Sequence, residues 1–182
     1  PLVFWLLMGS GIGTSLKTPA GGAAMNYLEY FFPGTLLMIL LFTAIFSTIS
    51  IIEDRKEGFL QGVLAAPVAR WSITSGKILG GATLAFFQAL LFALLLPLLG
   101  LSLDAGQCLL LVLVLAMSAL TLTGLGFILA WNMESVQGFH ALMNLFLIPL
   151  WLLSGALFPP EGAAGWIRLV MYFNPLTYQM AL

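Results

Sequence analysis

Charged side chains are scarce in this sequence. It has six Lys and Arg and seven Asp and Glu among 182 residues, or 7%, whereas soluble domains contain about 25%. Because 61% of the residues are hydrophobic, the composition excludes an ordinary soluble domain and indicates an integral membrane protein. The net charge of -1 argues against nucleic-acid binding, which relies on many Lys and Arg side chains.

Cysteine and histidine are scarcer still, with Cys108 and His140 as the single residue of each type. One cysteine excludes an internal disulfide framework and a multi-cysteine metal site, and one histidine supplies too few ligands for a metal centre. The sequence also has no Gly-Lys-Ser/Thr phosphate-binding loop, so ATP consumed by this system must bind another chain. We therefore expect no cofactor on this chain.

An intramembrane serine hydrolase is a hypothesis that Ser154 and His140 suggest. The two residues are 14 positions apart, which is roughly 21 Å if they share one helix. That distance is too long for proton transfer. We therefore expect Ser154 to be a packing residue.

Four apolar runs are long enough to cross a bilayer, which takes about 20 residues of helix. They cover residues 34–52, 78–99, 107–131 and 139–158. Partial runs occupy residues 1–12 and the segment from Leu176 onward. We expect an all-α integral membrane protein: a single transmembrane domain over residues 1–182, from a six-helix polytopic parent whose first and last spans are truncated here.

The connections between these runs predict the topology. Short turns at 100–106 and 132–138 imply antiparallel neighbouring helices. Loops 53–77 and 132–138 then share one side of the membrane, opposite 13–33, 100–106 and 159–175. Lys and Arg gather in cytoplasmic loops, and here they divide four to two: Arg55, Lys56, Arg70 and Lys77 against Lys17 and Arg168. We therefore expect loop 53–77 to be cytoplasmic.

Loop 53–77 is also the most charged segment of the chain. Residues 53–57 read Glu-Asp-Arg-Lys-Glu, and charges of this kind cannot lie in hydrocarbon without a large cost. Directly after them, apolar residues at i, i+1, i+4 and i+5 form one helical stripe, namely Phe59, Leu60, Val63 and Leu64. This helix either rests on lipid headgroups or sits in a groove on a cytoplasmic partner.

Polar residues within the spans are few. No acidic or basic side chain lies firmly mid-span, so a proton- or ion-coupled transporter lacks its usual relay. Gln88 and Asn144 either line a pathway or join buried hydrogen bonds. Gly76 and Gly80 form a small-xxx-small pair that permits close helix contact. The aromatic run Tyr27 to Phe32 suits an interfacial belt.

Three groups of residues resemble a known family. They are Tyr30-Phe31-Phe32-Pro33-Gly34, then Glu57-Gly58 through Leu64-Ala65-Ala66-Pro67-Val68 with Arg70, and finally Leu153 to Pro159 with Trp166 and Asn174-Pro175-Leu176-Thr177-Tyr178. In this order they resemble the permease subunit of type-2 ABC exporters, which include drug, lipo-oligosaccharide and polysaccharide exporters. The resemblance covers nearly the whole chain.

The resemblance implies a cytoplasmic coupling helix that contacts ABC ATPase subunits. Its residues here are Glu57, Gly58, Phe59, Leu60, Gln61, Val63, Leu64, Pro67 and Arg70. It also implies an outer re-entrant segment over 158–175, with Pro159, Pro160, Trp166, Asn174 and Pro175. Two permease copies, identical or different, would pair around a pathway in the inner (plasma) membrane, with ATP and magnesium on the ATPase partners.

The expected function is export of an amphipathic, lipidic or drug-like molecule from the cytoplasm, because the walls of the spans are apolar with few polar groups. The alternative is a membrane subunit that anchors or assembles an enzyme complex without transporting anything. That alternative predicts a bound cytoplasmic partner but no substrate-dependent ATP turnover.

Overall fold

The computed structural model of the chain describes residues 1–12, 27–65, 67, 69–101, 103–157 and 164–180. Over these residues the secondary structure is helical, with no strand. The elements in chain order are α1 (Leu2–Ile12), α2 (Tyr27–Ser47), α3 (Ile49–Lys56), α4 (Phe59–Ala65), α5 (Arg70–Ala93), η1 (Leu96–Leu99), α6 (Ala105–Trp131), α7 (Val136–Trp151), η2 (Leu152–Ala156), α8 (Gly165–Phe173) and α9 (Pro175–Met180).

Four helical segments are long and apolar enough to span a membrane, which confirms the expected all-α membrane fold. They are Tyr27–Lys56, Arg70–Leu99, Ala105–Trp131 and Val136–Ala156. The first begins at Tyr27 rather than Gly34, and α5 begins at Arg70 rather than Ile78. A six-helix parent stays a prediction.

The charged cluster at 53–57 is not a loop, contrary to expectation. Glu53 to Lys56 form the last turns of α3, and the Glu57 N–H donates to the Glu53 carbonyl at 2.9 Å. The physical reason is that an α-helix satisfies its own backbone groups, so a span can continue into water once its side chains become charged. The predicted loop therefore reduces to α4 and the short connections on either side of it.

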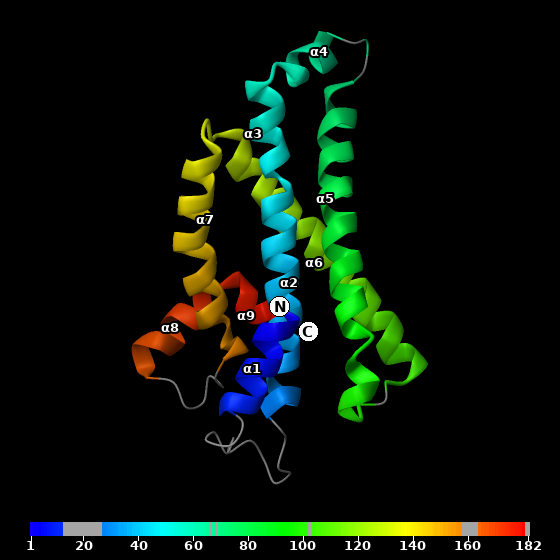
Figure 1. Cartoon of the computed structure of the whole chain (residues 1–182), viewed down its shortest axis with the longest axis vertical. Helices are drawn as coiled ribbons and strands as arrows, with labels where there is room; N and C mark the ends of the chain where they lie inside the picture. Colours follow the sequence, from blue (N-terminus) through cyan, green and yellow to red (C-terminus); the bar gives the residue numbers. More distant parts are fainter. Residues whose placement is uncertain (13–26, 66, 68, 102, 158–163, 181–182) are drawn as a thin grey trace.

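The spans pack around α2, which contacts α5 and α6 most closely (Figure 1). Glycines make this approach possible: a Cβ on Gly126 of α6 would lie 3.1 Å from the Ile45 Cα, and one on Gly81 would meet Ser47 and Thr123. The prediction for Gly76 and Gly80 was wrong, because no atom of a neighbouring helix, among the described residues, lies within 4 Å of a Cβ built on either. Those two glycines face away from the neighbouring helices.

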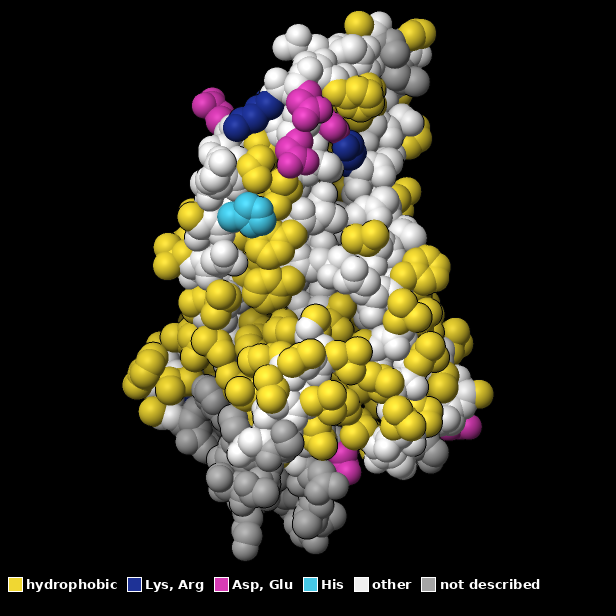
Figure 2. Space-filling model, viewed as in Figure 1, with side chains coloured by type: hydrophobic (Ala, Val, Ile, Leu, Met, Phe, Trp, Pro, Cys, Tyr) yellow, Lys and Arg dark blue, Asp and Glu magenta, His cyan; other side chains and the backbone are white. Residues whose placement is uncertain are grey.

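The molecule has two distinct ends, with α5 nearly parallel to its long axis (Figure 1). We call them the α4 end, which carries α4 and the turn between α6 and α7, and the α8 end, which carries η1, α8 and α9. This arrangement agrees with the alternating topology expected from the short turns. On the face shown in Figure 2, most acidic and basic side chains gather toward the α4 end, and hydrophobic side chains cover much of the rest.

Aromatic residues at the start of α2 form an inner core and not the lipid-facing belt that we expected. Tyr27, Phe31 and Phe32 are all buried. Phe32 stacks on Phe92 of α5 with ring centroids 4.8 Å apart. The reason is that the protein itself satisfies the polar ends of this cluster: the Tyr30 hydroxyl donates to the Gly155 carbonyl at 2.8 Å.

Candidate functional site

The short helix α4 is placed by a glycine. Gly58 joins α3 to α4 with φ 77°, a left-handed conformation that side chains rarely adopt and glycine adopts without strain. Its carbonyl accepts the N–H groups of Gln61 at 3.1 Å and Gly62 at 3.3 Å, which begins the new helix. The chain thus turns sharply out of α3 into α4, and α4 lies at the tip of the molecule (Figure 1).

The predicted apolar stripe on α4 is divided between two environments. Leu60 is 9% exposed, whereas Phe59 is 60% exposed and Val63 is half-buried. The Leu64 side chain lies outside the described residues. Leu60 lines a cavity of about 280 Å³ under α4, together with Ile51, Asp54, Arg70, Ile73, Thr74, Lys77, Phe127 and Trp131. Leu60 therefore supports α4 from beneath, and Phe59 is available to a partner.

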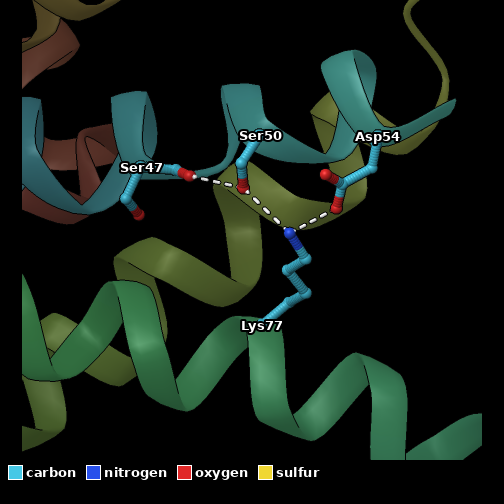
Figure 3. A network of polar contacts seen from close by, with 4 residues as sticks. All are labelled: Ser47, Ser50, Asp54 and Lys77. Atoms are coloured by element: carbon cyan, nitrogen blue, oxygen red, sulfur yellow. Dashed lines mark hydrogen bonds and ion pairs between the residues drawn. The ribbon is translucent and has the colours of Figure 1, made fainter. Parts of the chain in front are cut away.

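The helices on both sides of α4 are linked by an ion pair. Lys77 of α5 pairs with the Asp54 carboxylate of α3, and its Nζ also donates to the Ser50 hydroxyl at 3.4 Å. Ser50 in turn donates to the Ser47 carbonyl at 3.2 Å. Figure 3 shows this chain of contacts between the two helices. It holds α3 and α5 together directly below α4.

A second link ties α3 to α6. The Arg55 guanidinium donates to the Trp131 carbonyl at 2.6 Å, and its carbon lies 5.1 Å from the Trp131 ring centroid, a cation–π distance. Asp54 and Arg55 are adjacent on α3, so two neighbouring residues connect this helix to two others. As a result, the three spans that contain α3, α5 and α6 are cross-linked next to α4.

Comparison with known protein families identifies the family of this chain. The model of the ABC-2 type transporter family matches residues 1–182, the whole chain. The chain belongs to the ABC-2 type transporter family.

Two relatives carry names that agree with the family. A protein named as a transport permease, ycf38 of Cyanophora paradoxa, is 26% identical over 97% of this chain and 61% of its own length. A protein named as a multidrug ABC transporter permease, YbhR of Escherichia coli K12, is 25% identical over 85% of this chain and 42% of its own length. The chain thus spans about half the length of these relatives. No solved structure matches it.

The remaining predicted coupling residues of this ABC-2 family chain lie around α4. Glu57, Gln61, Pro67 and Arg70 are exposed, and Gly58 is half-buried in the turn. The structure brings Leu60 and Arg70 to the walls of one cavity. Whether these residues contact an ATPase stays a prediction.

The structure adds residues that the sequence analysis missed, namely the Asp54–Lys77 pair, the Arg55–Trp131 contact and the exposed Trp71. Each pairing joins residues from different spans, so no local spacing reveals it. One available signal was the opposite charge of Asp54 and Lys77 at adjoining ends of two antiparallel helices. Trp71 had a simpler signal, because it is a tryptophan that follows Arg70 inside the predicted loop 53–77, seven residues before the apolar run at 78–99.

The two candidate pathway residues do not come together within one chain. Gln88 of α5 accepts a hydrogen bond from the Thr43 hydroxyl at 2.6 Å, and Asn144 of α7 is exposed. Among the described residues, the Asn144 side chain makes no hydrogen bond. Their helices lie on either side of α2 (Figure 1).

The predicted re-entrant segment is described only in part. Pro159 and Pro160 lie outside the described residues. Trp166 is exposed on α8, and Pro175 begins α9. Asn174 is buried between these helices: its side-chain amide donates to the Leu150 carbonyl at 2.6 Å and its oxygen accepts from the Leu176 N–H at 3.0 Å.

The serine hydrolase hypothesis finds no geometric support. Ser154 is buried in η2 and donates to the Trp151 carbonyl at 2.7 Å. His140 is exposed on α7, and its ring lies 5.0 Å from that of Phe46. Over the part of the chain that the structure describes, no group of three or more His, Cys, Asp or Glu side chains could hold a metal ion.

Proposed function

We propose that this chain belongs to the transmembrane permease subunit of an ATP-driven exporter, whose ATPase resides on separate cytoplasmic subunits that bind ATP and magnesium. The observation that carries this proposal is the position of α4. It is a short helix at the tip of the molecule with Phe59 exposed, and it sits on three cross-linked spans.

Coupling through α4 requires that a displacement of α4 be transmitted to the membrane-spanning helices. ATP binding would close the ATPase pair and displace α4 with it. Because Asp54 and Arg55 tie α3 to α5 and α6, the displacement would pass to all three helices and not to α3 alone. Such a mechanism needs two global states that both the ATPase and the substrate bias.

A second permease copy would complete the transport pathway through the membrane. Gln137, His140 and Asn144 follow each other at i, i+3 and i+7 on α7, and all three are exposed. These polar side chains share one helix face, and polar groups facing lipid tails are costly. A second copy, with water between the two, would cover this face and could bring it near Gln88.

The substrate class that fits is amphipathic, lipidic or drug-like. The exposed surfaces of the spans are largely apolar, with scattered amides and hydroxyls that suit orientation of a mixed molecule more than solvation of an ion. The name of the E. coli relative, a multidrug permease, points the same way. Transport would run outward across the plasma membrane, with the α4 end in the cytoplasm, as the Lys and Arg distribution favours.

The proposal is tested with the full-length protein co-expressed with ABC ATPase subunits from its own source. We expect an ATPase subunit to co-purify, and we expect its loss when residues 59–64 are replaced by Gly and Ser. Phe59→Asp should abolish substrate-stimulated ATP turnover while the protein still inserts. Phe59→Leu, which keeps an apolar side chain, is the matched control and should retain it.

Two results would contradict the proposal. Normal export by the Phe59→Asp variant would show that α4 does not couple ATP turnover to transport. Co-purification of a cytoplasmic partner without any substrate-dependent ATP turnover would instead favour a subunit that anchors or assembles an enzyme complex.

A further inference from the structure

Trp71, in the first turn of α5, is the most exposed of the five tryptophans of the chain. It is 74% exposed, whereas Trp5 and Trp151 are buried. A tryptophan with this exposure is usually covered by lipid headgroups or by another protein, since its large ring is costly to leave in water. Its position along α5 distinguishes these two coverings.

The Asp54–Lys77 pair marks a reference level on α5. Charged residues 53–57 surround this level, so it lies at the edge of the hydrocarbon or outside it. Trp71 precedes Lys77 by six positions, which places it about 9 Å nearer the start of α5. The start of α5 is the end that lies toward α4 (Figure 1). The headgroup layer on one side of a bilayer is about 5 to 8 Å thick. Trp71 therefore lies at the outer limit of this layer or beyond it.

The neighbours of Trp71 also favour a protein covering. Arg70 is exposed beside it, and within the described part of the chain its guanidinium has no partner. Arg70 also lines the cavity that Leu60 closes, so this surface continues directly into the base of α4. Trp and Arg dominate the binding energy of protein interfaces when they enter pockets on the partner.

We propose that Trp71, together with the coupling residue Arg70 already predicted, forms a second anchor for the ATPase subunit, beside Phe59 of α4. The matching surface on the ATPase would be an apolar pocket that receives the indole ring, bordered by carboxylates that pair with Arg70. The inference rests on the proposed function, and it widens the coupling surface from one helix to two. A movement of the ATPase subunit would then displace α5 together with α4.

The experiment uses the full-length permease in nanodiscs and its purified ATPase subunit. Trp71→Ala should weaken binding of the ATPase subunit by about tenfold to a hundredfold, as expected for an interface hot spot. Trp71→Phe should retain most of the wild-type binding, and Arg70→Gln should weaken binding less than Trp71→Ala does. Trp166→Ala is the matched control for binding: Trp166 is 67% exposed on α8, at the opposite end, and its loss should leave ATPase binding unchanged.

A second measurement distinguishes protein from lipid as the covering. The fluorescence of Trp71, taken as the difference between wild type and Trp71→Phe, should be insensitive to brominated lipid and should change when the ATPase subunit is added. Strong quenching by brominated lipid, or unchanged ATPase binding by Trp71→Ala, would overturn the inference. If the wild-type permease binds no ATPase subunit, the proposed function itself fails as well.

Discussion

The two ends of this protein hold their helices together by different means. At the α4 end the links use the charged side chains of the Asp54–Lys77 ion pair and of Arg55, which contacts Trp131, and the pair is partly exposed: the side chains of Lys77 and Asp54 retain 32% and 20% exposure. At the α8 end the links run from uncharged side chains to backbone groups and are buried or partly buried. The Trp151 indole N–H donates to the Gly34 carbonyl at 2.8 Å, and Asn174 bridges two backbone groups.

This difference bears on which end moves. A partly exposed ion pair contributes about 0 to 1 kcal/mol, because water competes for both partners. A buried polar group that loses its partner costs about 1 to 3 kcal/mol. The contacts at the α4 end therefore add little to stability, so their removal should show in coupling more than in unfolding. The contacts at the α8 end fix one arrangement.

The largest expected effect on stability is at Asn174. Asn174→Leu would leave the Leu150 carbonyl and the Leu176 N–H without the bonds that this side chain provides. We expect a loss of about 2 kcal/mol or more, read from thermal unfolding of the full-length protein in detergent. Asn144→Leu is the control and should leave stability nearly unchanged, because among the described residues the Asn144 side chain makes no hydrogen bond that the change would break. Equal effects of the two changes would contradict the account of the α8 end.

Gly34→Ala should have the next largest effect on stability. A Cβ at this position would lie 2.8 Å from the Ala156 Cβ and 3.0 Å from the Ala156 carbonyl oxygen, so α2 and η2 would have to separate. Overpacking of this kind costs about 1 to 3 kcal/mol. Gly80→Ala provides the comparison, since the space around Gly80 is open. The same unfolding measurement should show no loss for that variant, and a loss as large as that of Gly34→Ala would refute the packing argument.

Lys77→Met should have the smallest effect on stability, below about 1 kcal/mol. Its effect should appear in coupling: ATP turnover by the reconstituted complex should respond less to substrate, because α5 no longer follows α3. The double variant Asp54→Lys with Lys77→Asp restores an ion pair of reversed polarity and should recover part of the response. If Lys77→Met keeps full coupling, the ion pair plays no part in transmission.

Much of the fold could be predicted from the sequence because bilayer thickness imposes a minimum length on apolar runs. All four complete spans were found in this way, and so was the short helix after Gly58. Their ends were less accurate. Hydropathy detects where hydrocarbon ends, but a helix such as α3 continues past that point for as long as its backbone bonds are satisfied.

The contacts between spans could not be predicted. The choice of Gly81 and Gly126 over Gly76 and Gly80 depends on how each helix is rotated toward its neighbours, which a single sequence does not record. The aromatic cluster at Tyr27 to Phe32 was assigned to the lipid interface for the same reason. Its hydroxyl partner, the Gly155 carbonyl, becomes free only because η2 interrupts the helix far along the chain.

The most direct test of the coupling role of the α4 end is a cross-linking measurement on the full-length protein with its ATPase. Phe59→Cys, in a background in which Cys108→Ser removes the native thiol, would be treated with a bifunctional cross-linker in native membranes. Leu98→Cys, at the exposed Leu98 of η1, is the control. We predict that the cysteine at 59 cross-links to the ATPase subunit and that the one at 98 does not. Cross-linking from 98 alone, or from neither position while the complex is intact, would contradict the account.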